Sequence, residues 1–256
     1  MLKARARGFF FVLGIIVVGV CVFLFFLKTD SPINETLPIN ETQAMKIFYD
    51  YPVVSTLDEM AGESEFIVIG RYTSLDSKWN MARNPDNITE EDSENYVEGW
   101  LYNFEIDDVL KGNLESRTIL VNHKYSQVIT TTESNAVVDD EGNILKAATE
   151  QNTLSFSVHD PMFIEPELDS TYILFLLKDK DFGNYYAAVE PFSIKVENGM
   201  PELQSNLLNN TKAFSEEIAV GGDRTIDVLC DVGMGVEDFI SGRSLEDIIQ
   251  AISTSR

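Results

Sequence analysis

The chain has 256 residues, and its 19 Lys and Arg residues against 42 Asp and Glu residues give a formal net charge of −23 at pH 7. Residues 1–27 hold three bases (Lys3, Arg5, Arg7) and no acid, so residues 28–256 carry 16 bases, 42 acids and a charge of −26. Such an acidic surface repels phosphate backbones, which excludes nucleic-acid binding. Two cysteines exclude a disulfide-rich scaffold, and 44% hydrophobic residues exclude a fully disordered chain.

Residues 9–27 form an apolar run of 19 residues without a charge. At about 1.5 Å per residue, a helix over this run reaches roughly 28 Å, close to the thickness of the bilayer hydrocarbon. Because the three bases precede the run, the positive-inside rule places the N-terminus in the cytoplasm. The sequence therefore predicts a single-pass cell-membrane protein with a cytoplasmic tail over residues 1–8 and a transmembrane helix over residues 9–27, with residues 28–256 extracytoplasmic.

The alternative is a cleaved signal peptide. The run is longer than the usual apolar region of about 7–15 residues, and no A-x-A-like site follows Leu27. A lipoprotein signal at Cys21 is disfavoured because Val20 precedes it and six apolar residues follow it. With Cys21 in the membrane, Cys230 has no intramolecular partner outside, so we expect no structural disulfide and no zinc site of paired cysteines.

Residues 28–44 are predicted to be a stalk. The sequence Pro-Ile-Asn-Glu-Thr at residues 32–36 repeats at residues 38–42, without the periodicity of a core segment. Asn34, Asn40, Asn87 and Asn209 each begin an N-x-[ST] sequon. These sequons indicate glycosylation in a eukaryotic secretory protein and no more than exposed polar loops in a bacterial one. We favour exposed loops.

Residues 45–256 are predicted to fold as one acidic domain. Thr56 and Glu59 have the spacing of a capping box, which predicts a short helix to about Gly62. Short apolar or alternating segments then predict eight or nine strands, with a continuous apolar strand over residues 172–177 as the central one. Asn198-Gly199 is a strong hairpin signal. The strands are expected at 66–69, from 102 to about 110, and at 119–122, 137–138, 144–145, 154–159, 172–177, 185–189 and 194–197.

The C-terminal part changes character. Gly221-Gly222, Gly233 and Gly235 predict a loop-rich stretch around residues 226–230. Ser244 then caps a final helix, and its apolar stripe is expected to pack onto the β core. The stripe consists of Leu245, Ile248, Ile249 and Ile252. The predicted fold class is therefore mainly β, an antiparallel barrel or sandwich with a short N-terminal and a C-terminal helix.

The two histidines offer little catalytic signal. His123 lies in phase with Ile119 and Val121, which is typical of a strand histidine facing the core. His159 is followed by Asp160, and a hydrolase built on them needs a nucleophile on a sharp turn and an oxyanion hole. The sequence has no G-x-S-x-G elbow and no H-x-K spacing. Pairs of carboxylates are too numerous to indicate glycoside hydrolysis, so we assign no catalytic residue.

Calcium is the cofactor that the acidic residues favour most. Asp179, Asp181 and Glu190 copy part of an EF-hand loop, but Gly183-Asn184 reverses the required order, which favours a hairpin turn. Residues 84–99 hold further acids and no base, and an exposed charged insertion between strands is the commoner meaning of such a run. The acids of this second candidate are Asp86, Glu90, Glu91, Asp92, Glu94 and Glu98.

Trp79, Tyr96 and Trp100 lie in or beside the long insertion over residues 75–98. Aromatic residues on an exposed loop would suit a carbohydrate or peptide contact. The favoured interpretation is that the tryptophans pin the insertion to the rest of the domain.

Three segments carry a resemblance to a group of proteins. Residues 66–71 (FIVIGR), residues 102–112 (YNFEIDDVLKG) and residues 172–176 (YILFL) are similar to strands of single-anchor extracytoplasmic proteins of Bacillus-type bacteria. The resemblance spans roughly residues 50–200 and implies membrane anchoring and export, with no site residues.

The sequence thus predicts a membrane-anchored extracytoplasmic binding or interaction module without enzymatic activity. Its acidity points to a protein or a neutral glycan as partner, besides the membrane that holds its N-terminal helix. The alternative is a divalent-cation-dependent envelope enzyme or a calcium-binding protein that uses the acidic loops.

Overall fold

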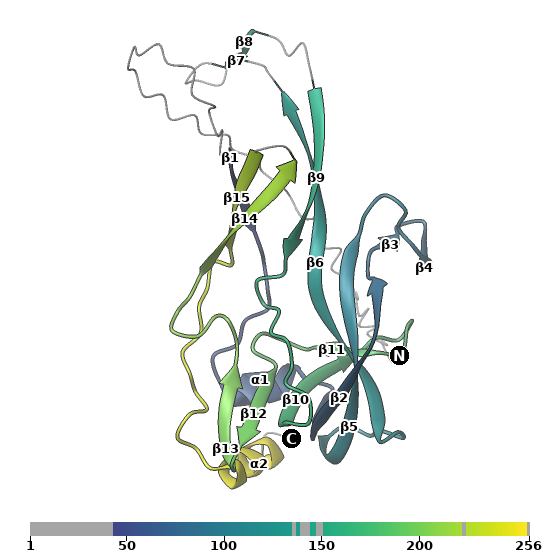
Figure 1. Ribbon diagram of the computed structural model, residues 1–256. Coiled ribbons are helices and arrows are strands. Elements are labelled where there is room, and N and C mark those ends of the chain that lie inside the picture. Colours follow the sequence, from purple (N-terminus) through teal and green to yellow (C-terminus); the bar gives the residue numbers. More distant parts are fainter. Residues whose placement is uncertain (1–42, 135–136, 139–143, 147–150, 222–223, 255–256) are drawn as a thin grey trace, which may run out of the picture.

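The computed structural model describes residues 43–134, 137–138, 144–146, 151–221 and 224–254, which form a mainly β structure with two short helices (Figure 1). The predicted tail, transmembrane segment and most of the stalk lie outside these residues. Within the described ranges, no helix is long and apolar enough to cross a membrane. The elements are β1 (Gln43–Phe48), α1 (Leu57–Glu63), β2 (Phe66–Asn80), β3 (Arg83–Asn84), β4 (Asn87–Glu91), β5 (Val97–Lys111), β6 (Thr118–Ser134), β7 (Val137–Val138), β8 (Ile144–Lys146), β9 (Gln151–His159), β10 (Thr171–Lys178), β11 (Tyr185–Ala187), β12 (Ser193–Glu197), β13 (Met200–Gln204), β14 (Ala213–Gly221), β15 (Arg224–Asp231) and α2 (Leu245–Thr254).

Five strands close into a barrel. β5 runs antiparallel to β2 and β6, β10 runs antiparallel to β2 and β11, and β11 closes the ring by running parallel to β6. Around the barrel, the strands follow the order β2-β5-β6-β11-β10, so the last two are exchanged relative to their order in the chain. This is a Greek-key closure of the kind that the OB-fold has. The prediction left a barrel and a sandwich open, and the structure has a barrel. The expectation of antiparallel strands holds only in part, because β11 and β6 are parallel and a ring with an odd number of strands cannot be antiparallel throughout.

β10 is the central strand, as predicted. Its residues 172–176 are all buried because each face of the strand packs on a different core. Tyr172, Leu174 and Leu176 point into the barrel, whereas Ile173 and Phe175 join a second core beneath the two helices. A strand buried on both faces reads as a continuous apolar run, which explains the sequence pattern.

The helices cover this second core. Thr56 caps α1, as predicted, by accepting a hydrogen bond from Glu59 N at 3.2 Å. Glu59 Oε2 accepts from the N–H of Ser55, one residue before the position that a capping box uses. Ser244 Oγ accepts from Asp247 N at 3.1 Å at the start of α2. The apolar stripe of α2 packs inward as predicted, with Ile248 and Ile252 fully buried.

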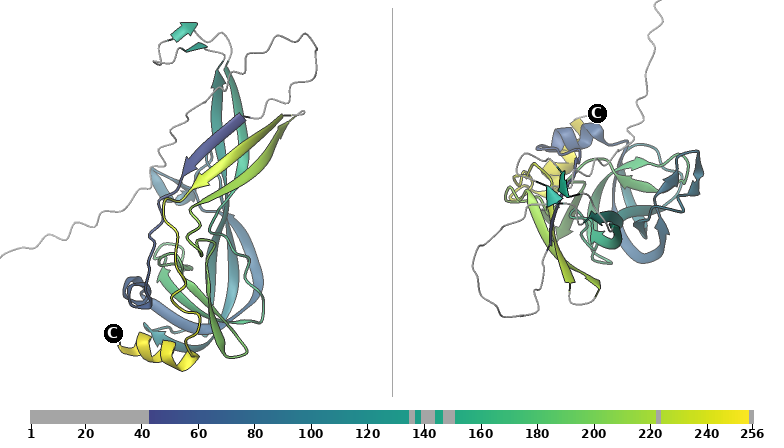
Figure 2. Two further views of the ribbon diagram at one scale, coloured as in Figure 1. Left: turned by 90° about the vertical axis from the view of Figure 1, so that its left-hand side faces the viewer. Right: turned by 90° about the horizontal axis from the view of Figure 1, so that it is seen from above.

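Beyond the barrel, β6 continues upward and pairs with β9 as a two-stranded ribbon. A three-stranded sheet in the order β1-β15-β14 packs against this ribbon, which makes the molecule elongated (Figures 1 and 2). The prediction of a loop-rich stretch around residues 226–230 was wrong. These residues form β15, whose Ile226, Val228 and Cys230 alternate into the third core and whose partner β1 comes from the other end of the domain.

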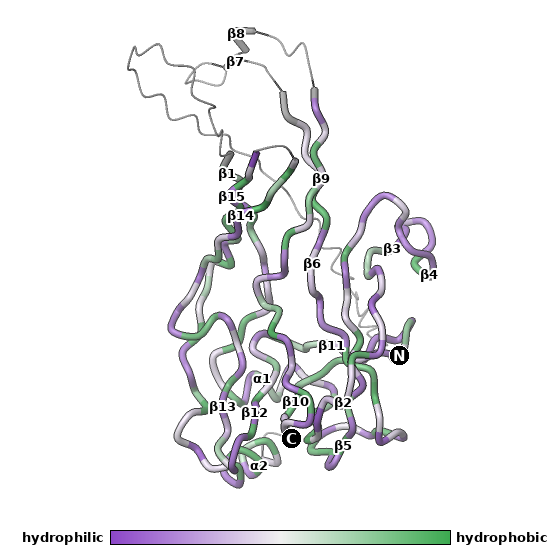
Figure 3. The backbone as a smooth tube through the Cα atoms, viewed as in Figure 1, coloured by the Kyte–Doolittle hydropathy of each residue, from purple (hydrophilic) through white to green (hydrophobic). Residues whose placement is uncertain are grey.

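The long insertion is also more regular than predicted. β2 extends to Asn80 and β5 begins at Val97, and the residues between them form the small β3–β4 hairpin, which is largely hydrophilic (Figure 3). The strands expected at residues 137–138 and 144–145 are present as β7 and β8, which pair with each other, and residues 139–143 lie outside the described residues. The hairpin predicted at Asn198-Gly199 is present as the antiparallel pair of β12 and β13. At this turn, Asn198 and Gly199 have φ values of 52° and 77°, as a two-residue hairpin turn requires.

Candidate functional site

A pocket of about 150 Å³ lies where the barrel seam opens, and we call it the seam pocket. β11 pairs with β6 only through Tyr185 with Val121 and Tyr186 with Asn122. β6 then runs on, whereas β11 ends at Ala187, so the two chain segments separate and leave a hollow between them. The pocket is lined by Tyr51, Pro52, Asn122, His123, Lys124, Asp160, Met162, Phe163, Ala187, Val189, Glu190 and Phe192.

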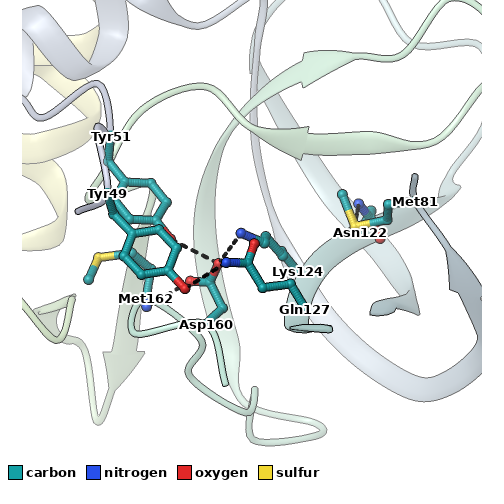
Figure 4. A network of polar contacts seen from close by, with 8 residues as sticks. All are labelled: Tyr49, Tyr51, Met81, Asn122, Lys124, Gln127, Asp160 and Met162. Carbon is teal, nitrogen blue, oxygen red and sulfur yellow. Dashed lines mark hydrogen bonds and ion pairs between the residues drawn. The ribbon is translucent and has the colours of Figure 1, made fainter. Parts of the chain in front are cut away.

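Asp160 lines the seam pocket and joins three neighbouring residues through its carboxylate. It follows β9 directly, and its carboxylate is buried, with Oδ1 accepting from Met162 N at 2.8 Å and Oδ2 accepting from the Tyr51 hydroxyl at 2.9 Å. Lys124 Nζ lies 3.1 Å from the same Oδ2 (Figure 4). Burial, and next the charge of Asp160, raise the pKa of Tyr51 far above its usual value. Tyr51 therefore stays a hydrogen-bond donor, and the charges of Asp160 and Lys124 offset each other.

Tyr49, two residues before Tyr51, extends this network. The rings of Tyr49 and Tyr51 stack with centroids 5.6 Å apart, and Gln127 Nε2 donates to the Tyr49 hydroxyl at 3.0 Å (Figure 4). Because these contacts join the segment before α1 to β6, they fix the ring of Tyr51 at the edge of the pocket.

Glu190 also lines the seam pocket and is 6% exposed. Its backbone is fixed by two hydrogen bonds to residues 52–54, Glu190 N to Pro52 O at 2.8 Å and Val54 N to Glu190 O at 3.0 Å. Ser205 Oγ donates to its Oε1 at 2.7 Å, and no basic side chain among the described residues pairs with the carboxyl. Burial, and to a smaller degree the charge of Asp160, raise the pKa of Glu190 to about 8, against the opposing effect of the Ser205 bond. At neutral pH the group is mostly protonated.

His123 lines the pocket and faces the barrel interior, as the sequence predicted. Its Nε2 is 3.0 Å from the Tyr72 hydroxyl, and aromatic rings surround it, with the centroids of Tyr102 at 5.3 Å and Phe192 at 5.5 Å. Burial lowers the pKa of His123 to about 4, so the imidazole is neutral at pH 7. The buried hydroxyl of Tyr102 has no hydrogen-bond partner in the described part of the chain.

A smaller cavity of about 20 Å³ adjoins the seam pocket and reaches the barrel core at Tyr72 and Tyr172. Both spaces are lined by His123, Met162, Glu190 and Phe192. A larger depression of about 550 Å³ lies between the β5–β6 loop and the β10–β11 turn. Its charged lining residues Glu115 and Lys178 are both exposed, so the seam pocket is the space that holds buried ionisable groups.

Both tryptophans are fixed within the structure, as the favoured interpretation held. Trp79 Nε1 donates to Asn122 Oδ1 at 2.8 Å, so Trp79 pins the end of β2 to β6. Trp100 stacks on Tyr125 with centroids 4.1 Å apart, beneath Lys78 Nζ at 4.0 Å. Tyr96 is 42% exposed.

His159 takes part in a surface contact between sheets. Its Nδ1 lies 2.6 Å from Glu216 Oε1 of β14 and its Nε2 lies 3.1 Å from the Tyr125 hydroxyl. Asp160, its neighbour in sequence, binds Tyr51 and Lys124 instead. The hypothetical pairing of His159 with Asp160 is therefore not formed.

The calcium candidates do not assemble into a site. Asp179 Oδ1 accepts from the backbone of Asp181 and Phe182, which is a turn cap, while Glu190 is buried in the seam pocket. Asp92 similarly caps the turn at Glu94 and Asn95. Among the described residues, no three His, Cys, Asp or Glu side chains are grouped so that they could hold a metal ion.

Sequence reasoning missed the pocket itself. Glu190 was considered only as the last ligand of an EF-hand loop, and Tyr51, Lys124 and Ser205 carried no signal, since they meet only through long-range packing. Comparison of the chain with protein-family models, curated proteins and solved structures finds no match.

Proposed function

We propose that the chain is a membrane-anchored extracytoplasmic binding module that takes a small ligand in the seam pocket and performs no catalysis. The observation that carries the proposal is the seam pocket: a hollow with apolar walls and a few fixed polar groups, the usual form of a small-molecule site. The basic start and the apolar run over residues 9–27 support the anchor and the external location of the domain.

The polar groups of the pocket are arranged to bind and not to react. Asp160 is held by Tyr51 and Lys124, and Nε2 of His123 is paired with the Tyr72 hydroxyl, which is buried in the barrel. A nucleophile needs an adjacent base that can receive its proton. The pocket offers a rigid framework with one carboxyl, Glu190, that has spare hydrogen-bonding capacity.

The test of binding uses the full chain in nanodiscs of zwitterionic lipid and a pocket-filling variant, Ala187→Leu. A panel of amines, amino acids, sugars and polyols is screened for a rise in the thermal midpoint. A ligand at 100 times its Kd adds about 2.7 kcal/mol, or about 5–10 °C for a domain of this size. The shift should be present in the wild-type chain and lost in Ala187→Leu, whose midpoint without ligand checks its folding. A panel that shifts both proteins equally, or neither, contradicts the proposal.

The predicted location has its own test. Protease added to intact cells should digest residues 28–256 and leave a short membrane-bound N-terminal fragment. Digestion that needs cell lysis would contradict the extracytoplasmic placement.

A further inference from the structure

We propose that the ligand of the seam pocket is a small primary alkylammonium ion, whose ammonium group binds the carboxylate of Glu190 and whose alkyl chain lies against the aromatic walls. The inference rests on the proposed function of the same pocket and names its ligand class.

The first argument is the balance of charge around the pocket. Lys124 Nζ lies 3.1 Å from Asp160 Oδ2, so this buried acid already has its cation. Glu190 is equally buried, but its hydrogen bond from Ser205 is a neutral one. A buried carboxylate is costly unless it is paired. Among the described residues, no basic side chain pairs with the carboxyl of Glu190. A cationic ligand in the pocket could therefore neutralise it.

The second argument is the nature of the walls. Tyr51, His123, Phe163 and Phe192 contribute aromatic rings to the lining. Ring faces attract ammonium groups, and apolar walls suit an alkyl chain. The chain itself makes such contacts nearby, with Lys78 Nζ 4.0 Å from the centroid of Trp100. A volume of about 150 Å³ limits the ligand to a few heavy atoms beyond the ammonium.

The third argument is the long-range field. Residues 28–256 carry a charge of −26, which raises the local concentration of cations and disfavours anions. A ligand with a carboxylate or a phosphate would be repelled by this field and would place its negative charge beside the carboxyl of Glu190.

The proposal implies that binding is coupled to proton release. The ionisable groups that share the seam pocket with Glu190 are Asp160 from the turn after β9, His123 and Lys124 from β6, and Tyr51 from the segment before α1. Tyr72 of β2 and Tyr172 of β10 share the smaller adjoining cavity with it. Because the pKa of Glu190 is about 8 in the free protein, most molecules must lose the carboxyl proton to solvent when an ammonium ion binds. The affinity should therefore rise with pH until Glu190 is ionised in the free pocket.

The experiment is calorimetric titration of the full chain in zwitterionic nanodiscs with n-butylammonium, 1-butanol and propionate, which have equal numbers of heavy atoms. We expect n-butylammonium alone to bind, about 50-fold more tightly at pH 8 than at pH 6, as one proton released from a group of pKa about 8 requires. Titration at pH 7 in two buffers of different ionisation enthalpy should show release of close to one proton.

Glu190→Gln should abolish both the binding and the proton release. Glu165→Gln removes the same charge from an exposed position near the pocket and should leave both unchanged. Should Glu190→Gln fail to fold, the proton release measured with the wild-type chain still tests whether Glu190 binds the ammonium group. Binding of n-butylammonium without proton release or pH dependence overturns the role of Glu190.

Two outcomes separate this inference from the proposed function. If 1-butanol or a neutral compound of the panel binds the wild-type pocket and n-butylammonium does not, the pocket is a binding site and the inference about its ligand is wrong. If no compound distinguishes the wild-type chain from Ala187→Leu, the proposed function is wrong as well.

Discussion

The indole nitrogen of Trp79 donates a hydrogen bond to Asn122 Oδ1 at 2.8 Å, passing over Gly99 of the strand between them. A Cβ atom on Gly99 would lie 2.5 Å from Trp79 Nε1 and 2.6 Å from Asn122 Oδ1. Only a glycine allows this approach across three strands. Because Asn122 is the last residue of β6 that pairs with β11, the contact fixes the point at which the barrel seam opens.

Gly99→Ala should therefore destabilise the domain. The added methyl group displaces the indole and breaks its hydrogen bond, and we expect a loss of about 1–3 kcal/mol in the free energy of unfolding, as for other overpacked sites. Urea denaturation measures the loss. Gly62→Ala is the control: nothing lies within 4 Å of its added Cβ in α1, and the change should stabilise the protein by about 0.5–1 kcal/mol. Equal midpoints for the two variants would contradict this account of Gly99.

Glu190 should make the protein less stable as the pH rises. Its pKa is about 8 in the folded state and near 4.5 when unfolded, so between these values the folded state holds the extra proton. Its contribution is complete below pH 4.5 and is lost as the pH rises through 8, at about 1.4 kcal/mol per pH unit. Denaturation between pH 7 and 8, above the pKa of His123 in both the folded and the unfolded state, should show this fall in the wild-type chain and a flatter profile in Glu190→Gln. Parallel profiles would refute the assignment.

His123 should act in the opposite direction at lower pH. Burial lowers its pKa from 6.5 to about 4, so between these values the unfolded state binds more protons. The contribution of His123 is present above pH 6.5 and is lost as the pH falls towards 4. In the Glu190→Gln background, stability should rise between pH 4 and 6.5, and the added change His123→Asn should remove that rise. A rise that persists would assign it to another group.

The pair of Asp160 and Lys124 should show strong coupling. Asp160→Asn leaves the half-buried ammonium of Lys124 without its acid, and Lys124→Met leaves a buried carboxylate without its base. Each single change should cost about 1.5–3 kcal/mol. The double variant should be more stable than the sum of the two losses predicts, with a coupling energy of about 0.5–3 kcal/mol measured by urea denaturation. Additive losses would mean that the pair does not stabilise the fold.

Local pattern predicted many elements of the fold. The cap of α1, the stripe of α2, the double burial of β10 and the turn at Asn198-Gly199 depend on residues that are close in sequence. β15 was not predicted because it forms a strand by pairing with β1, about 180 residues earlier in the chain, where Met45 lies opposite Val228. Its alternation of Ile226, Val228 and Cys230 was the signal, and flanking glycines obscured it.

The sequence by itself determined the acidity of residues 28–256, the apolar run before them, the mainly β class and the positions of both helices, because charge, hydropathy and capping are local properties. Tertiary structure alone decided that the barrel is closed by a parallel pair and that its seam opens beside Asn122. Tertiary structure also decided that Lys124 pairs with Asp160, whereas Glu190 receives only the neutral hydrogen bond from Ser205. The ionisation of a buried carboxyl depends on which side chains reach it through space, and spacing along the chain does not fix that.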